Sequence, residues 1–270
     1  MPFELPLATV ESLAIFLLVF CRMTGVLLSA PLLSGSTLPP QLRIWLGFGC
    51  ALLCFPIVRG FAPAGAATRL FSDVWLMTYA VLCELATGWV LGLVASIVLW
   101  GAQLAGHLVG QEIGLTLGDV FDPISETTGS PTTGLFYTVM LLVFLLLDGH
   151  KLLFLAVVKS YAAAPPGALL SLNPDSALYV TRDLGGEIWR LGVQIALPAI
   201  IGLGLVTVAL AILARTAPEM NIFVMGFTLR VGVGLLGLAL IVPFVVEAFA
   251  GTVGLSQVFL DKLLAAWGTP

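Results

Sequence analysis

Three charged side chains stand inside long apolar runs of this 270-residue chain, and their types are the ones most suited to chemistry. They are Arg22, Glu84 and Arg230. A charge at bilayer depth costs about 2.5–3.5 kcal/mol on insertion scales, so each of them needs a partner or contact with water. Arg22 and Glu84 form one possible pair. Such a pair is either a structural ion pair that holds helices in register or a set of charges that lines a conduit.

Catalytic and metal-binding chemistry has no support in the remaining residues. A metal site needs several His, Cys or carboxylate ligands at helical or loop spacing, and a catalytic pair needs a nucleophile near a base. The two histidines, His107 and His150, belong to neither arrangement, and the sequence lacks a phosphate loop and the common hydrolase motifs. The cysteines lie in apolar runs, as expected for small core residues. We therefore expect neither an enzyme nor a cofactor.

One segment places a small residue at every fourth position, which leaves one side of a helix without side chains. Glycine inside a helix costs about 1 kcal/mol relative to alanine, so such a row is useful only where another backbone comes close. We expect this face to pack tightly against a neighbour, and we expect that neighbour to be another subunit. The row consists of Ala102, Gly106, Gly110, Gly114 and Gly118.

Composition indicates that these helices lie in a membrane. Hydrophobic residues make up 59% of the chain and charged residues only 10%, against about 45–50% and about 25% in ordinary soluble domains. The net charge of −4 is spread along the chain. Nucleic-acid binding would need clustered Lys and Arg, so we do not expect a nucleic-acid partner.

Six apolar runs could form membrane helices, which need about 20 apolar residues each. The fourth run is interrupted at Asp148 and resumes at Leu152, and a polar connection covers residues 161–190. The last two runs are joined by a turn that contains Arg215, Pro218 and Asn221, and this length is typical of an antiparallel helical hairpin. The runs are Ser12–Ala30, Ile44–Val58, Val74–Trp100, Gly134–Leu147, Leu191–Ala214 and Ile222–Val246.

A polar, glycine-rich segment follows the glycine row and breaks the apolar chain. Polar backbone between membrane helices is tolerated where it is buried in protein or borders water. The segment therefore suits a loop that closes a channel, and it equally suits an ordinary connection at the membrane surface. The residues expected to carry a plug or pore loop are Gln111, Glu112, Phe121, Asp122 and Pro123.

Several short motifs, taken in order along nearly the whole chain, resemble the FliR/SctT family of type III secretion export gate subunits. They begin with Phe20-Cys-Arg-Met-Thr-Gly25 and Ala30-Pro31 and continue with Gly110-Gln111 and Ile113-Gly114. Later matches are Asp122-Pro123, Asp148-Gly149-His150, Ser160 and Pro166-Gly167. The turn from Arg215 through Pro218 and Met220-Asn221 to Phe223 is similar to the flagellar branch of the family. Lys151 departs from that branch, in which histidine is often repeated.

The resemblance implies an all-α, multi-helix integral membrane protein that is built into a heteromeric export gate. It implies FliP-like and FliQ-like partner subunits, an FlhB-like switch protein and unfolded flagellar proteins as the exported substrates, with no cofactor and no catalysed reaction. It also implies a bacterial inner-membrane location in the flagellar basal body, with the helices standing largely on the periplasmic side. By position, the segment between Gly110 and Gly134 matches a loop that plugs the closed conduit.

The resemblance further implies two parts, a FliP-like part over residues 1–190 and a FliQ-like hairpin with a tail over residues 191–270. Three alternatives stay open. The chain could serve an injectisome instead of a flagellum. It could be a secondary solute transporter, since Pro198 and Pro243 lie inside both hairpin helices, although no internal repeat is evident. It could also be a scaffold without a conduit.

Overall fold

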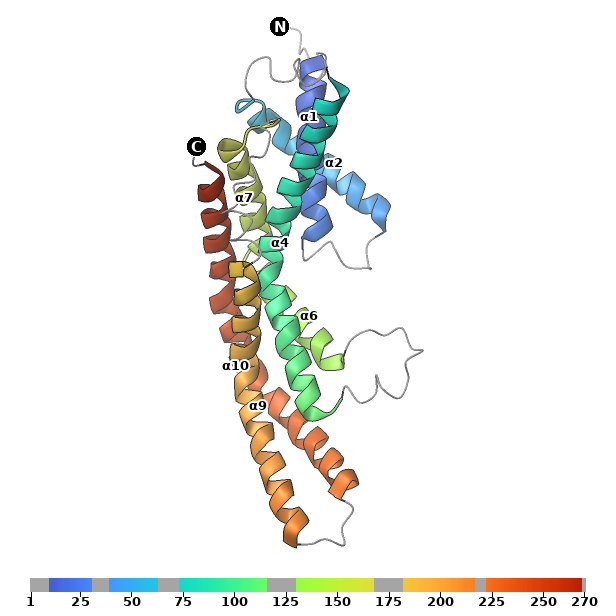
Figure 1. The fold of residues 1–270 in the computed structure, drawn as a ribbon, viewed down its shortest axis with the longest axis vertical. Coiled ribbons are helices and arrows are strands. Elements are labelled where there is room, and N and C mark those ends of the chain that lie inside the picture. Colours follow the sequence, from blue (N-terminus) through green and yellow to red (C-terminus); the bar gives the residue numbers. More distant parts are fainter. Residues whose placement is uncertain are drawn as a thin grey trace. The chain divides into compact units, whose positions relative to one another are not determined.

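A computed structural model describes residues 10–30, 39–62, 73–115, 130–167, 182–216 and 222–268. Within these ranges the chain forms seven α-helices and no strand (Figure 1). The predicted all-α fold class is therefore confirmed. The helices are α1 (Val10–Ser29), α2 (Pro40–Val58), α4 (Val74–Ile113), α6 (Pro131–Leu146), α7 (Gly149–Ala163), α9 (Leu184–Thr216) and α10 (Ile222–Gly268).

Four of these helices, α1, α2, α4 and α9, are long and apolar enough to cross a membrane. Helices α6 and α7 add a fifth candidate if the pair counts as one broken span. The described apolar part of α10 is shorter, at Val224–Ala239. The prediction of a multi-helix integral membrane protein is therefore confirmed, although six runs were expected and the described residues supply four or five candidate spans.

The helices of the C-terminal hairpin are longer than their apolar cores. Helix α9 begins at Leu184, before the apolar run, and its first turns contain an ion pair with 2.6 Å from Arg190 Nε to Glu187 Oε2. Helix α10 continues past Val246 to Gly268, and its last turns bury Leu260, Leu263 and Leu264 on one face. The expected hairpin bounds at Leu191 and Val246 are therefore wrong, because charged residues flank the apolar stretch without breaking the helix.

The expected interruption of the fourth apolar run is present. Asp148 stands between α6 and α7 with φ 58°, in the left-handed region that Asp and Asn enter more readily than most residues. Its carboxylate Oδ2 lies 2.9 Å from Lys151 Nζ on the exposed first turn of α7. The run is therefore two helices rather than one.

The chain divides into two compact units that are discontinuous in sequence. Unit 1 contains residues 1–96, 148–184 and 255–270, and unit 2 contains residues 97–147 and 185–254. The unit borders fall inside α4, between α6 and α7, after the first residue of α9 and inside α10. The division into FliP-like and FliQ-like parts concerns a likeness to other proteins and stays a prediction.

Unit 1 is built on α1, which packs against α2 through an aromatic cluster. Phe48 of α2 meets Phe16 of α1 edge-on with ring centroids 5.4 Å apart, and Phe55 meets Phe16 at 5.9 Å. Helix α2 also exposes large apolar residues, among them Trp45 at 71% and Leu53 at 70%. Among the described residues, α2 therefore leaves part of its apolar surface uncovered.

Unit 2 joins the second half of α4 to α6 and α9. Gly192 of α9 lies against Leu104 of α4, and Gly101 of α4 lies against Leu191 of α9. Because each glycine receives a leucine from the facing helix, the two helices approach closely along this seam.

Candidate functional site

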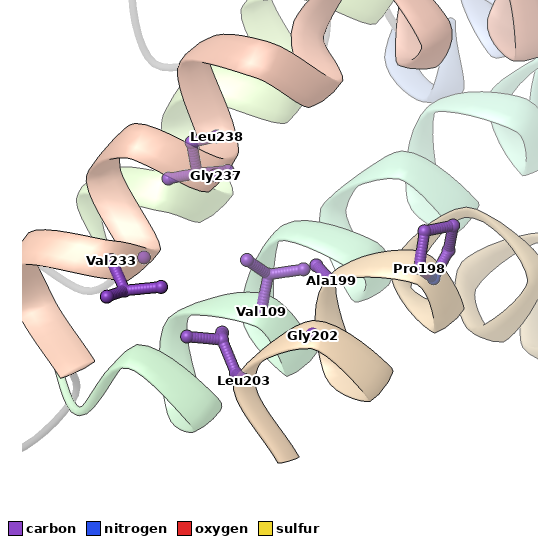
Figure 2. A pocket seen from close by; sticks show the side chains of 9 residues that line it. Val109, Pro198, Ala199, Gly202, Leu203, Val233, Gly237 and Leu238 are labelled. Carbon is purple, nitrogen blue, oxygen red and sulfur yellow. The ribbon is translucent and has the colours of Figure 1, made fainter. Parts of the chain in front are cut away.

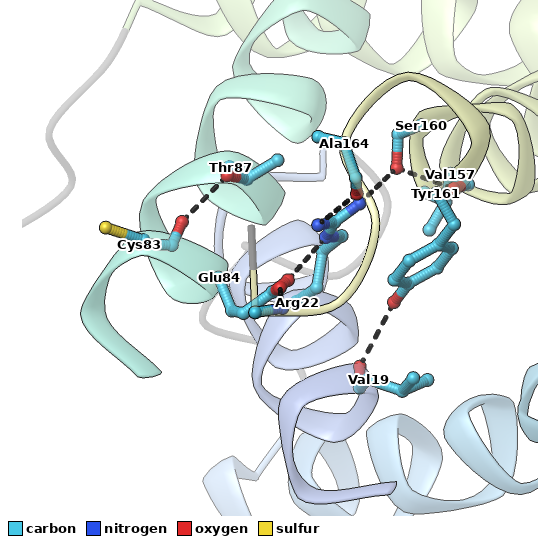
Figure 3. A network of polar contacts seen from close by, with 10 residues as sticks. Val19, Arg22, Cys83, Glu84, Thr87, Val157, Ser160, Tyr161 and Ala164 are labelled. Carbon is cyan, nitrogen blue, oxygen red and sulfur yellow. Dashed lines mark hydrogen bonds and ion pairs between the residues drawn. The ribbon is translucent and has the colours of Figure 1, made fainter. Parts of the chain in front are cut away.

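Arg22 is the most enclosed charged residue of the described chain, with 1% of its side chain exposed. Its guanidinium uses three nitrogens for three partners from different elements (Figure 3). Nε donates to Glu84 Oε2 of α4 at 2.6 Å, Nη1 donates to Ser160 Oγ of α7 at 2.9 Å, and Nη2 donates to the carbonyl of Ala164 at 2.9 Å. Each of the three guanidinium nitrogens thus donates a hydrogen bond.

Glu84 is equally enclosed, at 2% exposure, and its second oxygen also has a partner. Oε1 accepts a hydrogen bond at 3.0 Å from the backbone N–H of Gly167, a residue with φ 76°. The ring of Tyr161 lies 4.1 Å from Arg22 Cζ in a cation–π contact, and its hydroxyl donates to the Val19 carbonyl at 3.5 Å. Each oxygen of the Glu84 carboxylate is therefore hydrogen-bonded.

The possible pair between Arg22 and Glu84 is present. Because both side chains are closed off, the pair does not line open space in this structure. It ties α1, α4 and α7 together and holds the chain just after α7 through Ala164 and Gly167. Of the two interpretations open from the sequence, the geometry favours the structural ion pair.

Glycines bring α1 and α4 close enough for this pair to form. A Cβ atom on Gly88 of α4 would collide with the backbone carbonyl of Arg22, and one on Gly25 of α1 would collide with the carbonyl of Leu85. Ser29 Oγ donates to the Trp89 carbonyl at 2.8 Å, across the same contact. The Arg22–Glu84 pair is thus enclosed by backbone-to-backbone packing.

Arg230 differs from the other two charges. It lies on α10 in unit 2 and is only partly buried, and its Nε is shielded but has no hydrogen-bond partner among the described residues. The expected partner for this charge is therefore not found in the described part of the chain.

The glycine row of α4 packs tightly, but its neighbour lies in the same chain. A Cβ on Gly106 would stand 2.8 Å from the carbonyl oxygen of Thr132, and one on Gly110 would stand 2.6 Å from Ser130 Oγ. Both contacts come from the first turn of α6 and the residue before it. In this structure α6 of the same chain occupies the face at Gly106 and Gly110, and the role of the row in contacts with another subunit stays a prediction.

Gly114 has a different role from the one predicted. Helix α4 ends at Ile113, and Gly114 follows with φ 91°, a backbone conformation that glycine adopts without strain. The N–H of Leu115 donates to the Gly110 carbonyl and the N–H of Gly114 to the Gln111 carbonyl, both at 3.1 Å. This is a Schellman cap. Gly114 is therefore not part of the helical row that was predicted, and Gly118 lies outside the described residues.

The expected plug residues are described only in part. Gln111 and Glu112 occupy the last turn of α4, where Gln111 is exposed and Glu112 is half-buried. Phe121, Asp122 and Pro123 lie outside the described residues.

In the hairpin turn, Arg215 is in the last turn of α9, whereas Pro218 and Asn221 also lie outside the described residues. The plug and the turn stay predictions.

Several partners of the buried pair were not identified as such from the sequence. Ser160 and Gly167 entered only through the family resemblance, and Tyr161 and Ala164 were not singled out. A serine in an otherwise apolar helical face was the one local signal available. Gly88, Gly92 and Ser96 repeat the four-residue spacing of small residues and could have indicated the α1–α4 contact. Among the described residues, no group of three His, Cys, Asp or Glu could hold a metal ion.

Comparison with known proteins gives a family. The family model of bacterial export proteins, family 1, matches residues 13–255. This chain belongs to that family. The flagellar biosynthetic protein FliR of Pectobacterium carotovorum is 30% identical over 230 residues, which are 84% of this chain and 83% of that protein.

Two further relatives of this export-family chain represent two kinds of secretion system. FliR of Bacillus subtilis is 27% identical over 255 residues, 94% of this chain and 95% of its own length. The secretion system apparatus protein SsaT of Salmonella typhimurium is 27% identical over 241 residues, 88% of this chain and 91% of its own length. The similarity thus extends through both compact units.

Proposed function

We propose that this chain is a core subunit of the export gate of a flagellar type III secretion apparatus, where it forms part of the conduit for unfolded flagellar proteins. The observation that carries this proposal is the family match over residues 13–255, together with FliR relatives that align along most of the chain. A structural role in protein export also fits the described site, because the buried side chains of Arg22 and Glu84 hydrogen-bond to neighbouring elements and hold the helices together.

The proposed partners are FliP-like and FliQ-like subunits, with an FlhB-like switch protein. The surface of α9 supports partners of this kind, because large apolar residues are exposed at every third or fourth position. Gly204 on α9 and Gly232 on α10 likewise have no heavy atom within 4 Å of the place where a Cβ would stand. Small residues on an exposed apolar helix favour close approach by another helix. The exposed apolar stripe of α9 comprises Trp189, Val193, Leu197, Ile201, Leu205, Val208 and Ile212.

A location in the bacterial inner membrane, with helices that reach out on the periplasmic side, is part of the same proposal. Helix α4 has 40 residues and α10 has 47. At 1.5 Å per residue α4 measures about 60 Å, about twice the hydrocarbon thickness of a bilayer. Helices of this length, together with a buried ion pair between α1 and α4, fit a subunit that stands partly outside the lipid.

The closing element of the conduit is proposed to be the loop after α4, around Phe121 and Asp122. Its base is the Schellman cap at Gly114, with Gln111 and Glu112 in the turn before it. Deleting residues 118–125 is expected to raise leakage of ions through the assembled gate without dissolving the complex. Unchanged leakage from an intact complex would exclude a plug at this place.

The division into a FliP-like part over residues 1–190 and a FliQ-like hairpin over residues 191–270 is carried into the proposal. The antiparallel pair α9 and α10 supplies such a hairpin. Exchanging this hairpin for a FliQ-like protein's hairpin should retain binding to the neighbouring subunits, whereas exchanging α1 and α2 should not. Equal loss of binding in both chimeras would contradict the division.

The similarity to SsaT favours one alternative, an injectisome gate. Deleting the gene in its own host separates the two. The flagellar proposal predicts loss of swimming and of flagellar protein secretion, both restored by the intact gene. A motile deletion strain would contradict the flagellar role.

Co-purification with FliP-like and FliQ-like proteins, followed by mass measurement of the particle, tests the partners.

A further inference from the structure

An apolar cavity lies inside unit 2, where α4, α9 and α10 meet (Figure 2). Its volume is about 110 Å³, below the about 150 Å³ of an engineered apolar cavity that takes up benzene. Val109 of α4, Leu203 of α9 and Val233 of α10 present side chains to it, and every lining residue is apolar. A cavity of this size and character accepts a short length of hydrocarbon chain and does not hold water.

The cavity remains open because its walls contain glycine where other residues would fill the space. Gly202 of α9 and Gly237 of α10 line it, and neither has a heavy atom within 4 Å of the position that a Cβ would occupy. Val233 is 38% exposed, so the cavity also has an open side. Helix α9 is a candidate membrane span and is only 28% buried in its most apolar part, so the open side of the cavity can meet hydrocarbon when this chain stands alone.

A cation stands next to the cavity on the same face of α10. Arg230 precedes Val233 and Gly234 by three and four residues, so these residues share one side of the helix, with Arg230 one turn nearer to its start. The Arg230 Nε is shielded and has no hydrogen-bond partner among the described residues. Helical side chains tilt toward the N-terminus, so this guanidinium extends from the cavity toward the beginning of α10.

We propose that the cavity and Arg230 together form a binding site for one anionic phospholipid. Part of an acyl chain occupies the cavity, and the lipid phosphate pairs with the Arg230 guanidinium. Arginine binds phosphate through two parallel N–H groups, and a long side chain in a membrane helix carries its charge toward the headgroups. A hydrocarbon site beside a guanidinium whose Nε has no partner among the described residues matches the two ends of such a lipid.

The test uses the full chain in mild detergent and native mass spectrometry. Phosphatidylglycerol and phosphatidylcholine with the same acyl chains are titrated, and bound lipid is counted. The intact chain is expected to prefer phosphatidylglycerol by about five-fold, the effect of one basic residue. Arg230→Gln is expected to remove this preference. Gly237→Leu fills the cavity and is expected to weaken the retention of both lipids.

Matched controls are available because glycines with equally open surroundings lie outside the cavity. Gly232→Leu on α10 and Gly204→Leu on α9 add the same side chain away from the lining, and both should bind lipid as the intact chain does. If Gly237→Leu reduces helical content, Gly202→Leu fills the cavity from the other helix. The proposal is overturned if Arg230→Gln keeps the lipid preference, or if the cavity-filling and control variants retain lipid equally. It is also overturned if the intact chain binds neither lipid.

Discussion

The α1–α4 contact of unit 1 and the α9–α10 hairpin of unit 2 use the same small residues with opposite results. In the first, Gly25, Gly88 and Gly92 each meet atoms of the facing helix, and two buried charges find partners within the chain. In the second, Gly204 of α9 and Gly232 of α10 have no heavy atom within 4 Å of the position of a Cβ, and neither lines the cavity. A glycine row in an apolar sequence therefore indicates close packing but does not say whether the neighbour belongs to the same chain.

The buried pair gives the largest expected effect. Arg22→Ala leaves the Glu84 carboxylate buried with one partner lost, and we expect it to lower the free energy of unfolding by about 3–5 kcal/mol. Thermal unfolding of the full chain in detergent measures this change. Combining Arg22→Ala with Glu84→Ala should recover part of the loss, because no unpaired charge remains. A small effect of Arg22→Ala would mean that the α1–α4 contact is no more closed to solvent than the surface of the α9–α10 hairpin.

Alanine substitutions of two helical glycines should change stability in opposite directions. Gly88→Ala places a methyl group against the Arg22 carbonyl, so we expect a loss of about 1–3 kcal/mol. Gly204→Ala meets nothing within 4 Å, so its better helix propensity should add about 0.5–1 kcal/mol. Both are measured by the same thermal unfolding. Equal effects of the two substitutions would remove the distinction between a closed and an open face.

The end of α4 is expected to depend on backbone conformation rather than on a neighbour. Gly114→Ala puts a Cβ on a residue with φ 91°, which should cost about 1–2 kcal/mol, confined to the last turn. Hydrogen exchange should then speed up at the N–H groups of Gly114 and Leu115, which form the cap. Exchange that stays unchanged there would show that contacts to other elements hold this end.

The exposed ion pair between α7 and α10 should contribute least. Lys159 Nζ lies 3.4 Å from Asp261 Oδ1, and both side chains are about half exposed. Lys159→Ala is expected to change the unfolding free energy by less than about 0.5 kcal/mol, with a smaller change in high salt. It also serves as the control for Arg22→Ala, since both remove a cation. A loss comparable to that of Arg22→Ala would contradict the ranking by burial.

Sequence patterns predicted the helices well, because length and hydropathy alone identify them. They predicted the ends less well. Helix α9 begins at Leu184 rather than at Leu191, because the polar residues before the apolar run, Glu187 and Arg190 among them, are compatible with a helix. Conversely, the four-residue spacing of glycines predicted a helix through Gly118, whereas the positive φ of Gly114 ends it at Ile113. Glycine occurs both on tightly packed helix faces and at the ends of helices. Only the backbone conformation of the residue shows which of the two is present.

The Arg22–Glu84 pair could be predicted from the free-energy cost of placing a charge in an apolar run, since a charge there requires a partner. Its remaining hydrogen bonds could not, because Ser160 and Ala164 are far from Arg22 in sequence, at separations of 138 and 142 residues. The sequence likewise did not show which helix packs against the α4 glycine row. Nothing in the sequence between α4 and α6 indicates that α6 contacts this row. Long-range choices of this kind depend on the packing of the whole unit.

Photocrosslinking in cells tests the central claim most directly, namely that the hairpin is completed by other subunits whereas α1 and α4 complete each other. A photoreactive residue at Ile201, on the exposed stripe of α9, is compared with one at Leu91, which is fully buried in α4. The account predicts that Ile201 gives a crosslink to a second protein and that Leu91 gives only crosslinks within the chain. A crosslink to another subunit from Leu91, or none to any protein from Ile201, would contradict it.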